Sequence, residues 1–252
     1  MVRSCKQALA LGLPAIAFTE HLEFTTGGAG DAITGIAADA RWWNRIKPLD
    51  VTGYQAGIEE CRERFPSLRV LAGVEAGESH LFAESASAII RGHCWDRVLG
   101  SLHAVPHQGK LISADALFGH MPSDEAMRCY FTELLRLVEG SDLFEVLAHP
   151  DFPRRYWPAG PHRYEEKPFE EEYRTVMRAL AASGRVMEYN TRTPLASVEL
   201  ITWWRESGGR AVSFGSDAHV PRRVGDRFKL ALDIVEAAGF RPGRGPYDFW
   251  RV

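Results

Sequence analysis

Short apolar runs alternate along this chain with longer segments whose apolar residues recur every three or four positions. The first pattern is typical of buried strands, and the second is typical of helices that cover them. Strands are expected over 15–19, 69–74, 97–102, 143–147, 185–189 and 211–214. Helices are expected over 51–65, 80–91, 122–138, 169–183, 195–206 and 226–238.

This alternation predicts the α/β class, with a mainly parallel sheet that closes into a β/α barrel. The 252 residues match the ~250 residues of one such barrel, and a single domain is expected over 1–252. A further helix is predicted over 4–11 with no strand before it, as in a barrel that lacks its first strand. The outer edges of the strands at 15–19 and 211–214 are then expected to be unpaired.

Three connecting segments carry their own expectations. Residues 20–50 are expected to be irregular, with Trp42 and Trp43 either forming a wall of the site or packing in the fold. Residues 105–121 are expected to form a loop. The segment 246–250 is expected to pack back on the barrel.

A histidine or a carboxylate follows nearly every predicted strand, and a β/α barrel gathers these strand ends on one face. Mixed imidazole and carboxylate ligands suit zinc, manganese or iron. Two such cations about 3.5–4 Å apart can activate water and neutralise phosphoryl oxygens. The sequence therefore predicts a polynuclear metal site that hydrolyses a phosphate ester. The expected ligands are His21, Glu75, His103, His149, Asp217 and His219.

The composition limits which partners the protein is expected to bind and where in the cell it is expected to act. The net charge is −3 and no basic stripe is visible, which argues against a nucleic-acid partner. The four cysteines show no C-x-x-C spacing, as expected for reduced thiols in a cytoplasmic protein. The apolar run at 8–18 resembles a secretory signal, but Gly12 and Pro14 interrupt it, and it is shorter than the ~20 residues that span a bilayer. No membrane partner is expected, and the oligomeric state is left open.

The strand-end signatures also form a set that runs from about residue 9 to residue 239. They are the segments 18–21 (FTEH), 73–75 (GVE), 100–103 (GSLH), 147–149 (LAH), 188–190 (EYN) and 215–219 (GSDAH). In these segments the chain resembles the PHP (polymerase and histidinol phosphatase) family, in its histidinol-phosphatase-like branch. The resemblance implies a distorted (β/α)7 barrel that binds up to three divalent metal ions.

Carried over by position, the resemblance implies that Glu75 bridges two metals and that His103 and His149 complete the first metal position. It implies that Asp217 ligates the second metal. The ligands implied for the third metal are His21 and His219. The catalytic residues implied are Glu75, His103, Asp217 and His219.

The chain departs from the family pattern at its start. Family members open with a strand bearing His-x-His, whereas Met1 here falls at the predicted first helix. Either the start codon lies further upstream, which we favour, or the segment is genuinely absent. For the sequence as printed, one metal position is expected to be complete, and phosphatase activity is expected to be weak or absent.

Several further residues near the strand ends are candidates for binding or support. Arg154, Arg155 and Arg192 are expected to bind phosphate, because guanidinium groups match phosphate oxygens. Glu188 and Glu20 are expected to support the metal ligands.

The expected activity is hydrolysis of L-histidinol phosphate to L-histidinol and phosphate, a step of histidine biosynthesis, as the resemblance implies. Two alternatives stay open. The first is a related phosphoesterase with another small phosphorylated substrate, and the second is a truncated, inactive metal-binding module.

Overall fold

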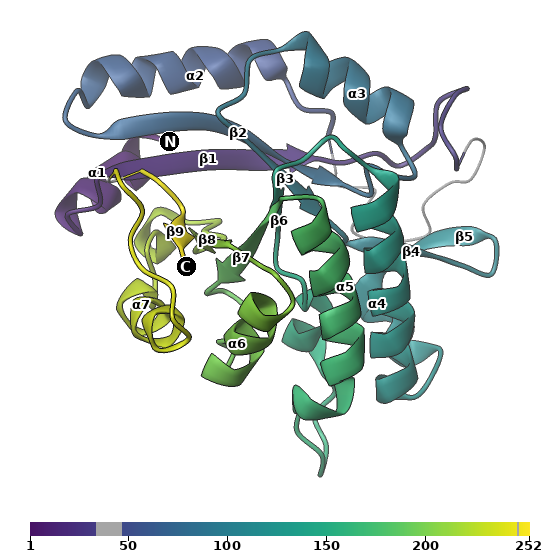
Figure 1. Ribbon diagram of the computed structural model, residues 1–252. Coiled ribbons are helices and arrows are strands. Elements are labelled where there is room, and N and C mark those ends of the chain that lie inside the picture. Colours follow the sequence, from purple (N-terminus) through teal and green to yellow (C-terminus); the bar gives the residue numbers. More distant parts are fainter. Residues whose placement is uncertain (34–46, 246) are drawn as a thin grey trace.

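The computed structural model describes residues 1–33, 47–245 and 247–252, and these form one curled sheet of seven strands flanked by helices (Figure 1). The strand order is β1-β2-β3-β6-β7-β8-β9, and neighbours among the first six run parallel. The strands are β1 Ala15–Leu22, β2 Arg69–Gly77, β3 Arg97–Ser101, β6 Val146–Leu147, β7 Val186–Asn190, β8 Ala211–Gly215 and β9 Trp250–Arg251. The predicted α/β class is confirmed, and the sheet curls as part of a barrel. Trp42 and Trp43 lie outside the described residues.

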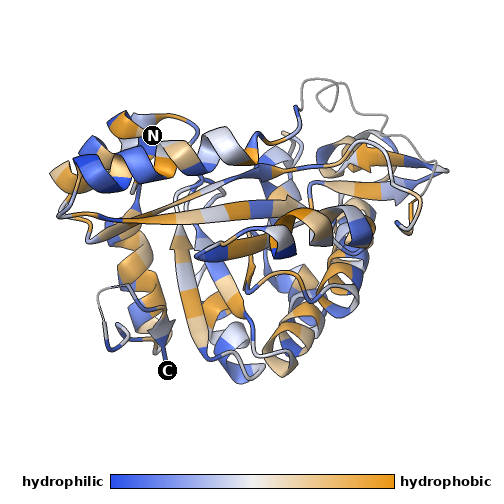
Figure 2. Cartoon of the chain, turned by 90° about the horizontal axis from the view of Figure 1, so that it is seen from above, coloured by the Kyte–Doolittle hydropathy of each residue, from blue (hydrophilic) through white to orange (hydrophobic). Residues whose placement is uncertain are grey.

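The helices between these strands cover the outer face of the sheet (Figure 1). Their apolar positions concentrate on the faces turned toward the strands (Figure 2). Local signals set some of the ends: the Asp50 side chain accepts a hydrogen bond from the Gly53 N–H at 3.0 Å and begins α2. The helices are α1 Val2–Ala10, α2 Val51–Arg64, α3 Ala83–Gly92, α4 Ser123–Gly140, α5 Glu170–Ala182, α6 Val198–Glu206 and α7 Phe228–Ala237.

The segment predicted as a loop over 105–121 is instead structured, so that expectation was wrong. An antiparallel hairpin pairs β4 (Ala104–His107) with β5 (Lys110–Ser113), and a 3₁₀ helix follows over Ala114–Gly119. The hairpin turns at Gln108 and Gly109, which both have positive φ. Two-residue hairpin turns require this backbone conformation, but Gln-Gly is a weaker sequence signal for it than Asn-Gly or Asp-Gly.

The expectation that the outer edge of the strand at 211–214 is unpaired was also wrong. β9 pairs antiparallel with β8, with Ala211 opposite Arg251 and Val212 opposite Trp250. The end of the chain therefore does return to the sheet. In the described part of the chain, β1 pairs with β2 and has no strand on its other side.

The main core lies between the sheet and the helices α4 to α7. Trp204 of α6 is fully buried there, and its indole N–H donates to the Ala211 carbonyl at 3.0 Å. A Cβ on Gly209 would lie 2.1 Å from the Trp204 ring, so this glycine makes room for the indole. The packing of α6 on β8 fixes the position of the strand that leads to Asp217.

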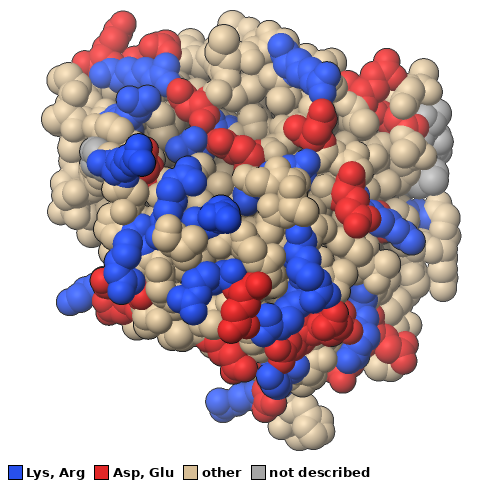
Figure 3. Space-filling view, viewed as in Figure 1, with Lys and Arg blue, Asp and Glu red and all other residues tan. Residues whose placement is uncertain are grey.

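The outer surfaces of the neighbouring helices are joined by ion pairs. Arg128 of α4 pairs with Glu172 of α5 at 2.8 Å, and Arg174 of α5 pairs with Glu206 of α6 at 2.8 Å. Basic and acidic side chains are accordingly interspersed on the face seen in Figure 3. Such exposed pairs contribute about 0–1 kcal/mol each, so the buried core dominates the stability of this region. Within the described residues, no helix is both long and apolar enough to cross a membrane.

Candidate metal centre

The strand-end side chains meet at one end of the sheet, beside a cavity of about 520 Å³. Strands β1 and β2 run in register, with His21 opposite Glu75. The cavity is lined from β1, β2, the segment after β6, β7 and the segment after β8. Parallel strands present all their carboxyl ends at one edge, which is why residues far apart in the sequence meet here. The expected ligands that line this cavity are His21, Glu75, His149, Asp217 and His219.

Glu75, His103 and His149 form a compact triangle of donor atoms. Oε1 of Glu75 lies 2.6 Å from Nε2 of His149 and 3.3 Å from Nε2 of His103. The two Nε2 atoms are 3.3 Å apart, and all three residues are buried. Two imidazole nitrogens and one carboxylate oxygen are a donor set that suits zinc, manganese or iron. These residues therefore fit a divalent cation.

The surroundings of this triangle favour the protonation states that bind a cation: an ionised carboxylate at Glu75 and a neutral imidazole at His149. Burial opposes ionisation of Glu75, but the positive charges of His21 and His103 hold the pKa of its carboxyl well below the usual range. Burial lowers the pKa of His149, which favours the neutral imidazole that a cation requires. For His103, burial is outweighed by Glu23 and Glu75, which raise its pKa well above the ordinary value.

His21 extends the centre on the other side of Glu75. Its Nδ1 lies 3.6 Å from Oε2 of Glu75, so the two oxygens of this carboxylate face different histidines. The ring of His21 is also 5.3 Å from that of His103 and 5.7 Å from that of His219. Burial lowers the pKa of His21, but Glu75 and Glu23 outweigh it and raise the pKa to about 9.

Asp217 and His219 form a second group with two arginines. Oδ2 of Asp217 is 2.7 Å from Nη2 of Arg155, and Oδ1 is 2.9 Å from Nη1 of Arg192. Nη1 of Arg192 also donates to Nδ1 of His219 at 2.8 Å. Burial opposes ionisation of Asp217, but the hydrogen bond with His219 and the charge of Arg155 hold its pKa well below the usual range. Among the described residues, neither Asp217 nor His219 joins a set of three donors within 4.8 Å.

Two of the expected ligands have a strained backbone. His149 has φ of 25° and Asp217 has φ of 46°, both in the left-handed region that non-glycine residues rarely adopt. The carboxylate of Glu188 accepts the His149 N–H at 2.8 Å and a hydrogen bond from the Asn190 amide at 3.0 Å. Strain of this kind persists where the surroundings hold it, and it concentrates at functional sites.

Arg154 is placed differently from its neighbour Arg155. It pairs with Asp151 at 3.1 Å and with Glu166 at 2.8 Å, whereas Arg155 pairs with the expected ligand Asp217. The Glu20 side chain accepts the N–H of His21 at 3.2 Å, which supports β1 locally.

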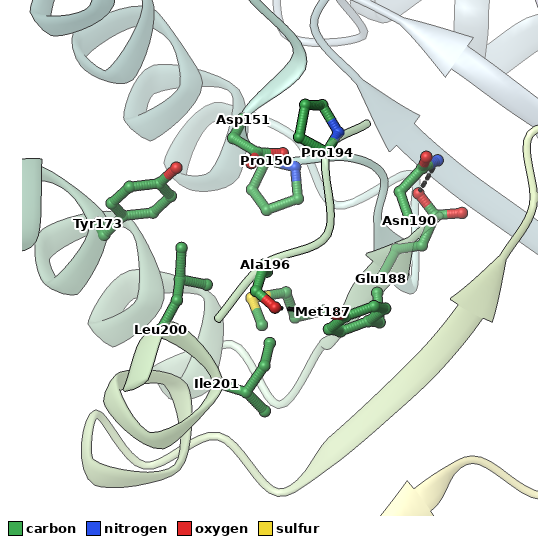
Figure 4. A pocket seen from close by; sticks show the side chains of 11 residues that line it. Pro150, Asp151, Tyr173, Met187, Glu188, Asn190, Pro194, Ala196, Leu200 and Ile201 are labelled. Atoms are coloured by element: carbon green, nitrogen blue, oxygen red, sulfur yellow. Dashed lines mark hydrogen bonds between the residues drawn. The ribbon is translucent and has the colours of Figure 1, made fainter. Parts of the chain in front are cut away.

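A second, much smaller cavity of about 20 Å³ lies behind Glu188 (Figure 4). It is lined mainly by apolar and aromatic side chains of β7 and α6 and by the loop at Pro150 and Asp151. A space of this size holds at most a water molecule, so it does not serve as a substrate site. The cavity of about 520 Å³ beside Glu75 is the candidate site, because five of the expected ligands line it.

Sequence reasoning missed Glu23. Strand β1 continues to Leu22, three residues beyond its predicted end, and this places Glu23 on the same side as His21. Oε1 of Glu23 lies 2.6 Å from Nδ1 of His103 and 3.2 Å from Nδ1 of His21. The only sequence signal was the spacing of two residues between His21 and Glu23.

The sheet and the donor set together define a metal-binding β/α barrel with its site at the carboxyl ends of the strands. The PHP domain family matches residues 1–192, which is more than half of the chain. The chain belongs to the PHP domain family.

Curated relatives extend this comparison. The chain is 24% identical over 244 residues to a histidinol-phosphatase of Lactococcus lactis subsp. lactis, covering 93% of this chain and 83% of that protein. It is 28% identical over 187 residues to a probable histidinol-phosphatase of Clostridium acetobutylicum, covering 71% of this chain and 72% of that protein.

The fold is also similar to that of a solved structure. The crystal structure of histidinol phosphate phosphatase from Lactococcus lactis, complexed with zinc, L-histidinol and phosphate, matches with a TM-score of 0.79. The match has 22% identity and covers 95% of this chain and 87% of that chain.

Proposed function

We propose that this protein is a metal-dependent phosphomonoesterase, acting in the cytoplasm, that hydrolyses L-histidinol phosphate to L-histidinol and phosphate in histidine biosynthesis. The observation that carries the proposal is the convergence of Glu75, His103 and His149 beside the large cavity, which Glu75 and His149 line. The names of the Lactococcus and Clostridium relatives support the choice of substrate. Zinc is the first cation to test, because it is present in the Lactococcus complex. The family pattern allows up to three such ions.

Divalent cations bound here would supply an activated water and positive charge for the phosphoryl oxygens. The residues of the chain would hold and orient the reactants. Glu75 presents one oxygen to His103 and His149 and the other to His21. Asp217 and His219 belong to the same cavity, and Arg192 lies against both of them. In this proposal Arg192 donates to the phosphate, and Arg155 fixes Asp217.

The substrate is tested by measuring phosphate release from a panel of phosphomonoesters, with the protein loaded separately with zinc, manganese or iron. We expect kcat/KM for histidinol phosphate to exceed the values for phosphoserine, glycerol phosphate and 4-nitrophenyl phosphate by about 100-fold. Equal values across the panel would point to another small phosphorylated substrate. No release from any ester with any of these metals would overturn the proposal and favour the inactive metal-binding module.

We expect Arg192→Ala to raise KM for the phosphomonoester by about 10- to 100-fold, because a charge-assisted hydrogen bond contributes about 1.5–3 kcal/mol. The side chain is about one third exposed, at 35%, so its removal leaves the core intact. Steady-state kinetics would separate KM from kcat. Arg178→Ala, which removes an exposed arginine of α5 that pairs with Glu171, is the control and should leave both unchanged. An unaltered KM for Arg192→Ala would remove this residue from the phosphate site.

A further inference from the structure

Glu23 is a buried carboxylate that contacts two of the expected metal ligands. Its side chain is 1% exposed. One oxygen, Oε1, lies 2.6 Å from Nδ1 of His103 and 3.2 Å from Nδ1 of His21. The other oxygen, Oε2, is buried and has no hydrogen-bond partner among the described residues. Burying a carboxylate oxygen in this way is costly, so the position of Glu23 calls for a functional explanation.

The two nitrogens of the His103 ring face different groups. Nδ1 faces Glu23, whereas Nε2 faces Glu75 at 3.3 Å and His149 at 3.3 Å. His103 must be neutral to bind a cation, and a neutral imidazole has one N–H and one lone pair. A hydrogen bond to the Glu23 carboxylate places the N–H on Nδ1, and the lone pair of Nε2 is then directed at the triangle of donors.

The single lone pair of His103 also decides whether Glu23 is a metal ligand or a hydrogen-bond partner of the His103 ring. Glu23, His21 and His103 also lie close enough together to hold an ion. A neutral His103 ring cannot use its single lone pair toward that set and toward Glu75 and His149 at the same time. The triangle with Glu75 and His149 uses Nε2, so Nδ1 is left as the donor to Glu23.

The backbone around His103 is fixed by a second carboxylate. Oε1 of Glu78 accepts the N–H groups of His103 at 2.6 Å and of Ala104 at 2.8 Å. With its backbone held by Glu78 and its ring held by Glu23, His103 has little freedom to turn.

Glycine at position 77 makes room for the Glu23 carboxylate. A Cβ on Gly77 would lie 2.2 Å from Oε2 of Glu23, well inside contact distance. The segment after Glu23 is held by Asp31, whose carboxylate accepts the N–H groups of Gly28 at 2.8 Å and of Glu84, in α3, at 2.9 Å. The absence of a side chain at Gly77 therefore allows Glu23 to lie against the His103 ring.

We propose that Glu23 is a positioning residue that fixes the tautomer and orientation of His103 for a cation held with Glu75 and His149, and that it does not itself bind the ion. This inference rests on the proposed metal-dependent function. Outer carboxylates of this kind typically change metal affinity by about 10- to 100-fold when they are removed.

The test measures zinc binding to metal-free protein by competition with a chromogenic chelator, together with the number of ions bound at saturation. Glu23→Ala should bind the same number of ions as the unaltered protein, with affinity about 10- to 100-fold weaker at the tightest site. Glu23→Gln keeps an oxygen that can accept the Nδ1–H, so its loss should be smaller. One ion fewer in Glu23→Ala would show that Glu23 is a ligand and overturn the proposal, as would unchanged affinity.

A second variant displaces the carboxylate without removing it. Gly77→Ala pushes against the flexible end of Glu23 and so should leave the fold intact, and it should weaken zinc binding in the same direction as Glu23→Ala. Glu133→Gln is the matched control: Glu133 is also buried, and it contacts His80 at 2.8 Å. It should keep the affinity of the unaltered protein, and equal weakening in this control would contradict a specific role for Glu23. Failure of the unaltered protein to bind zinc would instead contradict the proposed function.

Discussion

Replacing His103 by alanine is expected to lower kcat/KM for the phosphomonoester by about 10³-fold or more, which corresponds to about 4 kcal/mol of transition-state stabilisation. The substitution removes Nε2 from the triangle with Glu75 and His149 and leaves two donors. It also leaves the Glu23 carboxylate, which His103 contacts at 2.6 Å, without that partner. A loosely held cation loses both its charge stabilisation and its alignment with the substrate.

The measurement is steady-state phosphate release at saturating metal, accompanied by circular dichroism to check the fold. His80→Ala is a matched control, because His80 is also buried and contacts Glu133 at 2.8 Å. His80 belongs to neither group of possible metal ligands among the described residues, so this variant should lose stability but keep its rate. A folded His103→Ala protein that retains the rate of the unaltered enzyme would remove His103 from the reaction.

Asp217→Asn is expected to reduce kcat by about 10²- to 10³-fold, the size of effect seen when one group that supports transition-state charge is lost. The carboxylate lies between Arg155 and Arg192, at 2.7 and 2.9 Å. Its removal leaves two guanidinium groups close together without the charge that balances them. A cation on this side of the cavity would also lose its carboxylate ligand.

The kinetic assay should be run with Asp233→Asn beside it, because Asp233 is an exposed aspartate of α7. This control should match the unaltered protein in rate and melting temperature. Bound metal should also be counted: because Asp217 is proposed to ligate the second metal, Asp217→Asn should bind fewer ions. If Asp217→Asn binds its full set of ions and turns over normally, Asp217 has no part in the site.

The positions of the main site residues could be predicted because each follows an apolar strand. Parallel strands collect their carboxyl ends, so Glu75 and His149 had to lie near one another once the strands were recognised. The same reasoning placed His21 at the end of β1, opposite Glu75. The strand pattern alone was therefore enough to predict that most of the site residues lie close together.

Other features depended on contacts that a linear pattern does not contain. Glu23 reaches His103 only because β1 extends to Leu22 and Gly77 has no side chain. Arg154 and Arg155 looked equivalent in the sequence, but they occupy consecutive positions of a short 3₁₀ helix, where side chains project in different directions. Only Arg155 reaches Asp217.

The pairing of β8 with β9 could not be predicted for a similar reason. The pair is antiparallel and joins residues about forty positions apart, and β9 is only two residues long. So short a strand has no periodic pattern of its own. Its place is decided by the edge that β8 offers.

X-ray diffraction from zinc-loaded crystals, recorded on both sides of the zinc absorption edge, tests the central claim most directly. We expect an anomalous peak within bonding distance, about 2.0–2.2 Å, of Oε1 of Glu75, Nε2 of His103 and Nε2 of His149. Zinc bound only elsewhere on the protein, with these three atoms uncoordinated, would contradict the account.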